Sequence, residues 1–133
     1  ATVVSHSEKY WQPDESWCEE RSLDYLPVVF PGFSWYHLKG GELGQIPRRK
    51  GAFLWSQIAE AKRSGSDMIY VAMFDEVDEG TAIFKCVNNP PSGDGLPFLD
   101  YEGLPSDYYL KLVGEAGRLL RGERDLAEGQ PEW

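Results

Sequence analysis

The sequence predicts an α/β fold built from parallel βα units, on three observations. Residues 68–74 form a nearly continuous apolar run, which suits a strand buried on both faces, as in a parallel sheet covered by helices. Residues 106–121 repeat apolar side chains at helical spacing. Helix-like and strand-like segments alternate along the chain, the pattern of βα units. We expect two to four strands, which are too few to close an eight-stranded barrel.

The first half of the chain is expected to hold a helix and then a strand. Pro13 is tolerated in a first helical turn, and acidic residues follow it, so a helix is predicted at 13–21. A strand is predicted at 25–30, and Pro27 favours an early or edge position because it lacks an N–H for the ladder.

A second unit follows at the carboxyl end of that strand. Residues 33–37 are expected there, where parallel sheets contact ligands. The glycine-rich stretch 38–50 is predicted to be a long loop, and such loops in small domains are often functional. A helix is predicted at 52–64 because its apolar residues form a broad stripe and Gly65 supplies a stop.

The second half is expected to be irregular until its last helix. Residues 81–87 suit a strand or an extended loop, and 97–101 a short strand or a loop at the same edge. Residues 88–95 carry plain turn chemistry. With the helix at 106–121, a single α/β domain is predicted for residues 1–122, followed by a loose polar tail at 123–133.

Composition and charge exclude several classes of function. The formal charge is −9, so the chain has no electrostatic attraction for nucleic acid or an anionic membrane surface. No apolar run approaches the roughly 18 residues of a membrane span. The two distant cysteines, Cys18 and Cys86, suit two buried free thiols, with a single disulfide as the alternative. The two histidines are too few and too isolated for a zinc site, and no cofactor is expected.

An acidic cluster directly follows the apolar run. Asp75, Glu76, Asp78 and Glu79 precede Gly80, at the strand end where parallel α/β sheets place their chemistry. The alternative is an acidic turn that merely keeps a strand end solvated. We interpret the cluster as an active-site edge.

Three motifs carry a resemblance to a known family. They are Tyr25-x-Pro27-Val28-Val29-x-Pro31-Gly32-Phe33-Ser34-Trp35, then Ile46-Pro47-Arg48 with Phe53-Leu54-Trp55, and Glu76-x-x-Glu79-Gly80-Thr81. Together they resemble the C-terminal half of glycoside hydrolase family 71/99-like proteins, which are (β/α)8 TIM barrels that include retaining endo-α-mannosidases. Val77 stands where the mannosidases usually carry Trp. A small αβα sandwich that dimerises through its sheet is the alternative architecture.

The resemblance implies a role for two of the four carboxylates. Glu76 would be the base that assists through the sugar's 2-hydroxyl, and Glu79 would be the acid/base. The chemistry fits, because glycosidic cleavage needs one protonated acid and one ionised group. On a turn, side chains three residues apart can lie on one side, whereas a regular strand would separate them. Asp75 and Asp78 share this spacing, so the sequence alone does not choose the pair, and they are kept as sugar contacts.

Aromatic residues supply the other candidate sugar contacts. Trp35 and Tyr36 can stack on pyranose rings, His37 can make one hydrogen bond, and Tyr101 follows on a nearby loop. The alternative for each is core packing, which we expect for Trp11, Trp17 and Trp55.

Two functions follow from these features. The first is a glycoside hydrolase-like enzyme acting on an α-linked glycan, and the second is a lectin-like protein that binds such a glycan without turnover. The open sheet edges of so small a sheet further predict a homodimer, or association with a missing N-terminal barrel half.

Overall fold

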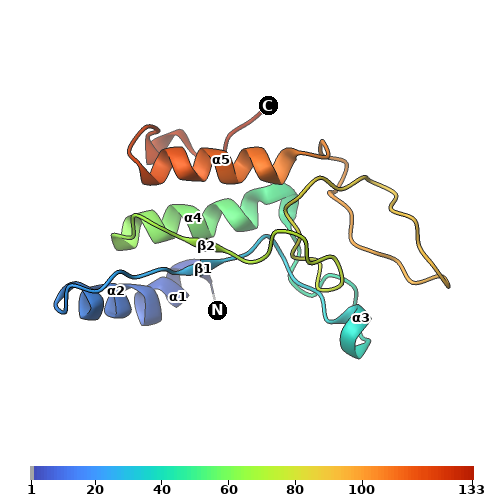
Figure 1. The fold of residues 1–133 in the computed structure, drawn as a ribbon, viewed down its shortest axis with the longest axis horizontal. Coiled ribbons are helices and arrows are strands. Elements are labelled where there is room, and N and C mark those ends of the chain that lie inside the picture. Colours follow the sequence, from blue (N-terminus) through green and yellow to red (C-terminus); the bar gives the residue numbers. More distant parts are fainter. Residues whose placement is uncertain (1) are drawn as a thin grey trace.

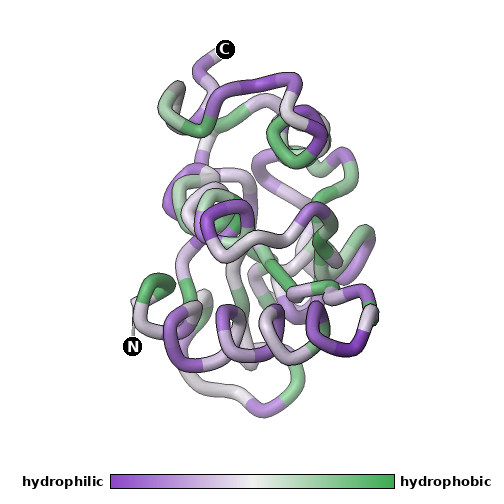
Figure 2. Tube along the Cα trace, turned by 90° about the vertical axis from the view of Figure 1, so that its left-hand side faces the viewer, coloured by the Kyte–Doolittle hydropathy of each residue, from purple (hydrophilic) through white to green (hydrophobic). Residues whose placement is uncertain are grey.

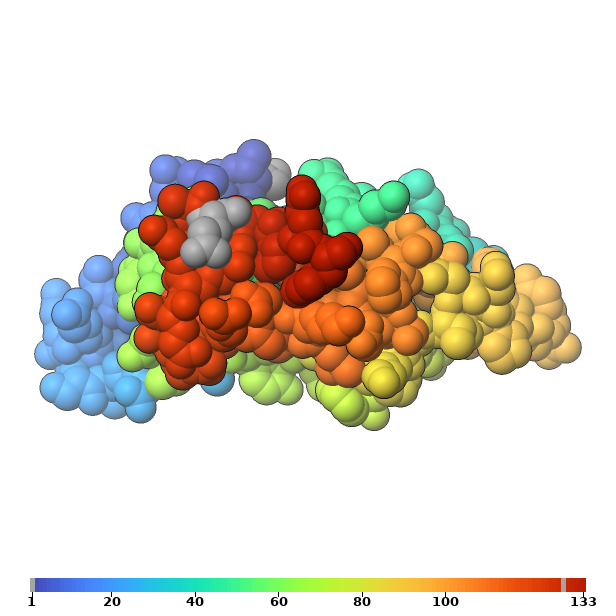
Figure 3. All heavy atoms as spheres, turned by 90° about the horizontal axis from the view of Figure 1, so that it is seen from above, coloured from blue at the N-terminus to red at the C-terminus, as the bar shows by residue number. Residues whose placement is uncertain are grey.

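The computed structural model describes residues 2–133, with the backbone alone at residue 128. Helix α5 (Tyr108–Leu120) runs beside helix α4 (Ala52–Ser64), and the strands β1 (Val28–Val29) and β2 (Tyr70–Val71) lie next to α4 (Figure 1). The molecule is elongated, with residues near 20 at one end and residues near 90 at the other (Figure 3). Residue 1, which the predicted domain includes, lies outside the described residues.

The two strands pair in parallel, as the sequence predicts. Val28 stands opposite Tyr70 and Val29 opposite Val71. The ladder continues through the N–H of Tyr70, which donates to Pro27 O at 3.0 Å, and that of Ala72, which donates to Val29 O at 2.9 Å. Pro27 thus takes part as an acceptor, the one backbone role open to it.

The length and burial of the strands differ from the prediction. The runs 25–30 and 68–74 each keep only two strand residues. The second run was expected to be buried on both faces, and this expectation is wrong: Tyr70 is 46% exposed and Phe74 is 59% exposed. Its apolar side chains have cover on one side only, because nothing in residues 2–133 packs over the other.

The N-terminal helix begins earlier than the predicted 13–21. It comprises α1 (Val3–His6), a π-helical turn η1 (Ser7–Trp11) and α2 (Gln12–Glu19). Its hydrophobic start lies beside the N-terminus in Figure 2. A capping box opens the helix, since Thr2 Oγ1 accepts from Ser5 N at 3.1 Å and Ser5 Oγ accepts from Thr2 N at 2.9 Å.

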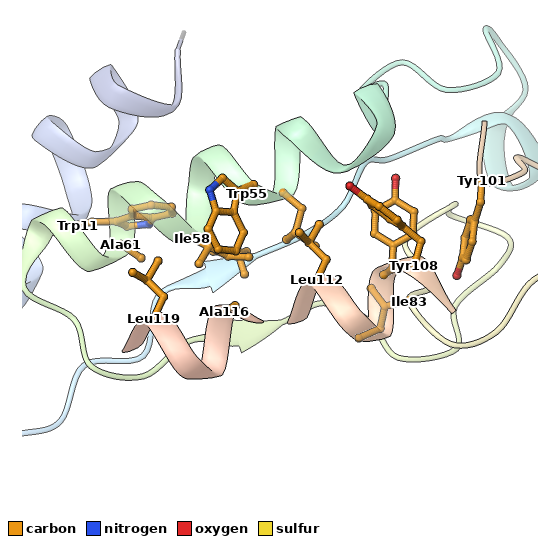
Figure 4. Close-up of a cluster of buried hydrophobic side chains, with 13 residues drawn as sticks. Trp11, Trp55, Ile58, Ala61, Ile83, Tyr101, Tyr108, Leu112, Ala116 and Leu119 are labelled. Carbon is orange, nitrogen blue, oxygen red and sulfur yellow. The ribbon is translucent and has the colours of Figure 1, made fainter. Parts of the chain in front are cut away.

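The two long helices confirm the periodicity argument. Helix α4 has the predicted bounds and ends at Gly65, whose φ of 107° is the left-handed stop. Buried side chains form a row between α4 and α5, from Trp11 at one end to Tyr101 at the other (Figure 4). Trp11 and Trp55 belong to this core, but Trp17 is 52% exposed, so its predicted core position is wrong.

Irregular chain forms the end of the molecule opposite α2. Residues 81–87 and 97–101 are extended loops and not strands, which decides the two open alternatives. A short helix, α3 (Tyr36–Lys39), follows Trp35, and a 3-10 turn, η2 (Arg49–Gly51), precedes α4. An antiparallel bridge between Phe33 and Ile46 closes the segment 33–46, which contains α3.

The segment 123–133, predicted to be a loose polar tail, has contacts with the rest of the chain. A 3-10 turn, η3 (Leu126–Glu128), returns the chain onto α5. Gln130 Nε2 donates to Lys50 O at 3.0 Å and to Tyr108 Oη at 2.6 Å. The ring of Trp133 packs edge-on against Tyr108, with 5.2 Å between centroids. Between residues 2 and 133 no helix has the length and apolar character to span a membrane.

Candidate active site

The acidic cluster lies on a turn that the backbone closes on itself. Past β2, Met73 N donates to Thr81 O at 3.2 Å, and Ile83 N donates to Phe74 O at 3.0 Å. Inside this frame, Thr81 N donates to Glu76 O at 3.1 Å. We call residues 75–81 the glutamate turn. It is not a regular strand, so side chains three residues apart need not point to opposite faces.

The four carboxylates differ in exposure along the glutamate turn. Asp75 and Asp78 are exposed, whereas Glu76 and Glu79 are half-buried. Glu76 Oε1 accepts a hydrogen bond from Asp78 N at 2.9 Å, which fixes this side chain over its own turn. Partial burial distinguishes the two glutamates from the two aspartates, and Glu76 has this side-chain hydrogen bond in addition.

A second motif, around Ser34, contacts the glutamate turn directly. Ser34 is 1% exposed, and its N–H donates to Glu79 O at 2.7 Å. Its Oγ accepts from Tyr36 N at 3.3 Å and from Gly44 N at 3.1 Å. The segments that carried the resemblance, 31–35 and 76–81, are therefore neighbours in space.

Trp35 is the most accessible of the predicted aromatic contacts. Its indole is 39% exposed, and the ring of Phe33 meets it edge-on at 4.7 Å. Lys39 Nζ lies 4.0 Å from the indole centroid. Trp35 N donates to Gln45 Oε1 at 2.7 Å, which anchors the backbone beneath the ring. An anchored, half-open indole can serve as a stacking surface.

His37 and Tyr36 are more enclosed. The Nε2 atom of His37 lies 2.8 Å from Pro97 O, and because a carbonyl only accepts, this nitrogen carries the proton. The imidazole stacks on Phe98 with 4.4 Å between centroids. His37 thus joins α3 to the loop before Tyr101. Tyr36 is half-buried beside it.

Tyr101 lies in the buried core. It is 1% exposed, and its Oη is 2.5 Å from Phe84 O and 3.2 Å from Ala82 O, within donating distance of either carbonyl. Burial, followed by a hydrogen bond with Cys86, raises the pKa of Tyr101. Tyr101 lies on a loop, as predicted, and it lines the cavity described below. Its sugar contact stays a prediction.

Arg48 is a residue of the site that the sequence analysis left without a role. It is 5% exposed, and its Nη2 donates to Gly80 O at 2.9 Å and to Ala82 O at 2.7 Å. Its guanidinium lies 4.9 Å from the Tyr101 ring centroid and 4.6 Å from that of Tyr109. The motif Ile46-Pro47-Arg48 was the available signal, since it is one of the three motifs that carry the family resemblance.

A cavity of about 210 Å³ opens behind the glutamate turn. Its walls are mostly apolar and come from the turn, through Val77 and Gly80, and from the loop 86–101. Gly80 closes the wall tightly: its φ is 65°, and a Cβ there would come within 2.5 Å of Leu99 Cδ1. In the described part of the chain no three His, Cys, Asp or Glu side chains gather as metal ligands do.

The fold and the motifs define a class of protein. The sequence profile of glycosyl hydrolase family 99 matches residues 1–120, so the chain belongs to that family. This confirms the resemblance inferred from the motifs.

Individual relatives carry related names. The chain is 26% identical over 119 residues to the glycoprotein endo-alpha-1,2-mannosidase of Mus musculus, covering 89% of this chain and 25% of that protein. Two structures of the GH99 endo-alpha-mannosidase of Bacteroides thetaiotaomicron superpose with TM-scores of 0.73 and 0.72, at 27% and 26% identity. One of the two contains BIS-TRIS-Propane.

These relatives are much longer than the chain. The superpositions cover 86% and 84% of this chain but 35% and 33% of the solved chains. The solved relatives are TIM-barrel enzymes, and of the two predicted architectures they support the barrel segment. The chain thus corresponds to part of a barrel, with two parallel strands and their helices.

Proposed function

We propose that the glutamate turn is the sugar site of a glycoside hydrolase-like protein that acts on an α-linked glycan. The observation that carries the proposal is the junction of the two motifs. Ser34 N holds Glu79 O at 2.7 Å, and the half-open indole of Trp35 follows Ser34 directly. A carboxylate pair suits cleavage of a glycosidic bond, and an accessible aromatic residue near it suits binding of the sugar.

The roles follow from the family chemistry. Glu79 protonates the leaving oxygen as the acid, and Glu76 assists as the base through the 2-hydroxyl of the sugar. Both side chains are half-buried, which gives them orientation without closing access. Membership of family 99 and the mannosidase names of the relatives support an α-mannoside as the substrate.

Carboxamide variants of the whole protein test this proposal. Glu79→Gln and Glu76→Gln should each lower turnover of an α-1,2-linked manno-oligosaccharide by about 100-fold or more, the usual contribution of a general acid or base. Glu19→Gln, at an exposed position on α2, is the matched control and should leave turnover unchanged. Full loss in Asp75→Asn or Asp78→Asn, with retained turnover in the glutamate variants, would assign the chemistry to the aspartates instead.

A second candidate function is a lectin-like protein that binds such a glycan without turnover. The 39% exposure of Trp35 supports it, because stacking of a sugar on an aromatic face needs no carboxylate chemistry. Binding of the manno-oligosaccharide by wild type, with no product formed and no effect of Glu79→Gln on affinity above a few-fold, would select this lectin-like function.

We also propose that the open side of the two-stranded sheet is covered by association. Val28, Tyr70 and Phe74 are 52%, 46% and 59% exposed on or beside the strands. Such edges and apolar faces favour pairing with a second copy of the chain. Light scattering coupled to gel filtration should give at least twice the 15.1 kDa of the chain. A monodisperse particle of chain mass would contradict this proposal.

A further inference from the structure

Arg48 is a buried cation without an acidic partner. It is 5% exposed, and no carboxylate in residues 2–133 forms an ion pair with it. A charge removed from water without an opposite charge is costly, so its retention requires compensation from other groups. A residue needed only to fill the same space would be apolar.

The hydrogen bonds that compensate the buried charge of Arg48 come from one nitrogen of its guanidinium and do not satisfy all of its N–H groups. One nitrogen, Nη2, serves both Gly80 O and Ala82 O, while the faces of Tyr101 and Tyr109 flank the guanidinium. The Nε and Nη1 atoms of Arg48 are buried and have no hydrogen-bond acceptor among residues 2–133. The favourable polar contacts of this side chain are therefore concentrated on two carbonyls of one short segment.

Those two carbonyls belong to the glutamate turn and its exit. Gly80 directly follows Glu79, and Ala82 directly follows Thr81. From the opposite direction, Ser34 N holds Glu79 O. Three carbonyls of residues 79–82 thus each have a donor from a distant segment, which fixes the path of the backbone through the turn.

The aliphatic part of the Arg48 side chain packs against Gly32, in a second motif. A Cβ on Gly32 would come within 2.8 Å of Arg48 Cγ, so only glycine leaves room for the arginine to pass. Gly32 and Arg48 belong to two of the three motifs, and Gly80 belongs to the third. The three motifs therefore meet at the Arg48 side chain: Gly32 leaves room for its aliphatic part, and Gly80 supplies one of its two acceptors.

We propose that Arg48 is a positioning residue: its guanidinium holds Gly80 O and Ala82 O and thereby sets the orientation of Glu76 and Glu79 in the glutamate turn. The proposal rests on the proposed function in taking this turn as the sugar site. Arg48 does not touch the sugar, and it acts through the backbone.

Native-state hydrogen exchange measured by NMR tests this role without requiring turnover. The reporters are the amides of Ser34 and Thr81, which bond to the turn. The references are the amides of Ile58 and Leu112, in the helical core. Arg48→Met should raise exchange at the reporters at least about tenfold more than at the references, as expected for local opening. Arg48→Lys, which keeps the charge and one donor, should recover part of this protection.

Tyr101→Phe is the matched control, because it removes the hydroxyl that approaches Ala82 O and keeps the ring beneath Arg48. It should leave the Ser34 and Thr81 amides protected. Equal acceleration at reporters and references in Arg48→Met would show a merely structural residue and overturn the proposal. Unchanged exchange at the reporters would overturn it as well.

Glycan titration separates this proposal from the proposed function. Selective opening in Arg48→Met, together with weaker binding of the manno-oligosaccharide, supports both. If wild type binds no glycan but the selective opening is found, Arg48 still organises the turn and the sugar site is wrong. If wild type binds the glycan and Arg48→Met binds it equally, Arg48 does not position the site.

Discussion

The helical end and the loop end of the molecule are stabilised in different ways. Between α4 and α5, Leu54, Ile58 and Leu112 are each 0% exposed, and apolar burial holds the helices together. At the loop end, single polar side chains hold the backbone. Asn88 alone donates to Leu104 O at 2.9 Å and accepts from Tyr101 N at 3.2 Å and Gly103 N at 3.1 Å.

This difference determines how a mutation acts. Truncating an apolar side chain in the helical core removes contacts shared by the whole domain, so it lowers the free energy of unfolding. Removing a polar side chain at the loop end releases a few backbone groups and opens that end alone. The candidate site therefore depends on a small number of residues, of which Arg48 and Ser34 reach the glutamate turn itself.

The largest expected effect is at the helical end. Leu112→Ala should lower the free energy of unfolding by about 2–5 kcal/mol, because it leaves a cavity between α4 and α5. Denaturant unfolding followed by far-ultraviolet circular dichroism measures this loss. A change below about 1 kcal/mol would show that the two helices do not form the common core.

Alkaline pH should weaken the junction of the two ends. Burial raises the pKa of Tyr109 from 10.0 to about 12, and the nearby Arg48 charge opposes this shift without cancelling it. The folded protein keeps the proton where the unfolded chain loses it. Stability from this group is therefore full below pH 10 and is lost as pH rises from 10 to 12, by about 2 kcal/mol.

The matched variant for this prediction is Tyr109→Phe. Its free energy of unfolding should fall less steeply than that of wild type over the same pH interval, as measured by urea titrations at each pH. Identical slopes in the two proteins would exclude Tyr109 as the source of the pH dependence.

Gly80→Ala should produce a smaller loss, centred on the loop end. The residue has a φ of 65°, and the added Cβ would meet Leu99 Cδ1 at 2.5 Å. We expect about 1–2 kcal/mol of destabilisation from strain and contact together. Gly93→Ala is the control, with no atom within 4 Å of the added methyl group, and thermal unfolding should distinguish the two. Equal melting temperatures for both variants would contradict the tight wall at Gly80.

Trp35→Ala should have the smallest effect on stability, because its indole is 39% exposed. Affinity for an α-linked manno-oligosaccharide should nevertheless fall by about 1–2 kcal/mol, the range for a stacked aromatic contact. Calorimetric titration and melting curves together check this. A large drop in melting temperature with unchanged affinity would place Trp35 in the core instead.

The sequence predicts the helical end better than the loop end. Helix α4 and most of α5 follow from apolar spacing and a glycine stop, because those signals are local. The first helix was placed too late because Pro13 is typical of a helix start, whereas here a π-helical turn leads into it from Thr2. The capping pair Thr2 and Ser5 was the missed signal.

The candidate site was predicted only in part, for a physical reason. The glutamates stand out as a charged cluster after an apolar run, and Trp35 as an aromatic after a strand. Arg48 bonds across 32 and 34 residues of sequence, and no local pattern reports such a contact. The apolar run 68–74 led to a wrong prediction of burial on both faces, because one face has no cover within residues 2–133.

The most direct test of the central claim is an NMR titration of the protein with an α-1,2-linked manno-oligosaccharide. If the glutamate turn is the sugar site, the amide shifts that change should cluster at residues 76–81 and 34–36, while those of α4 and α5 stay in place. Saturable changes confined to the helices or to the segment 123–133, with none at the glutamate turn, would contradict the account.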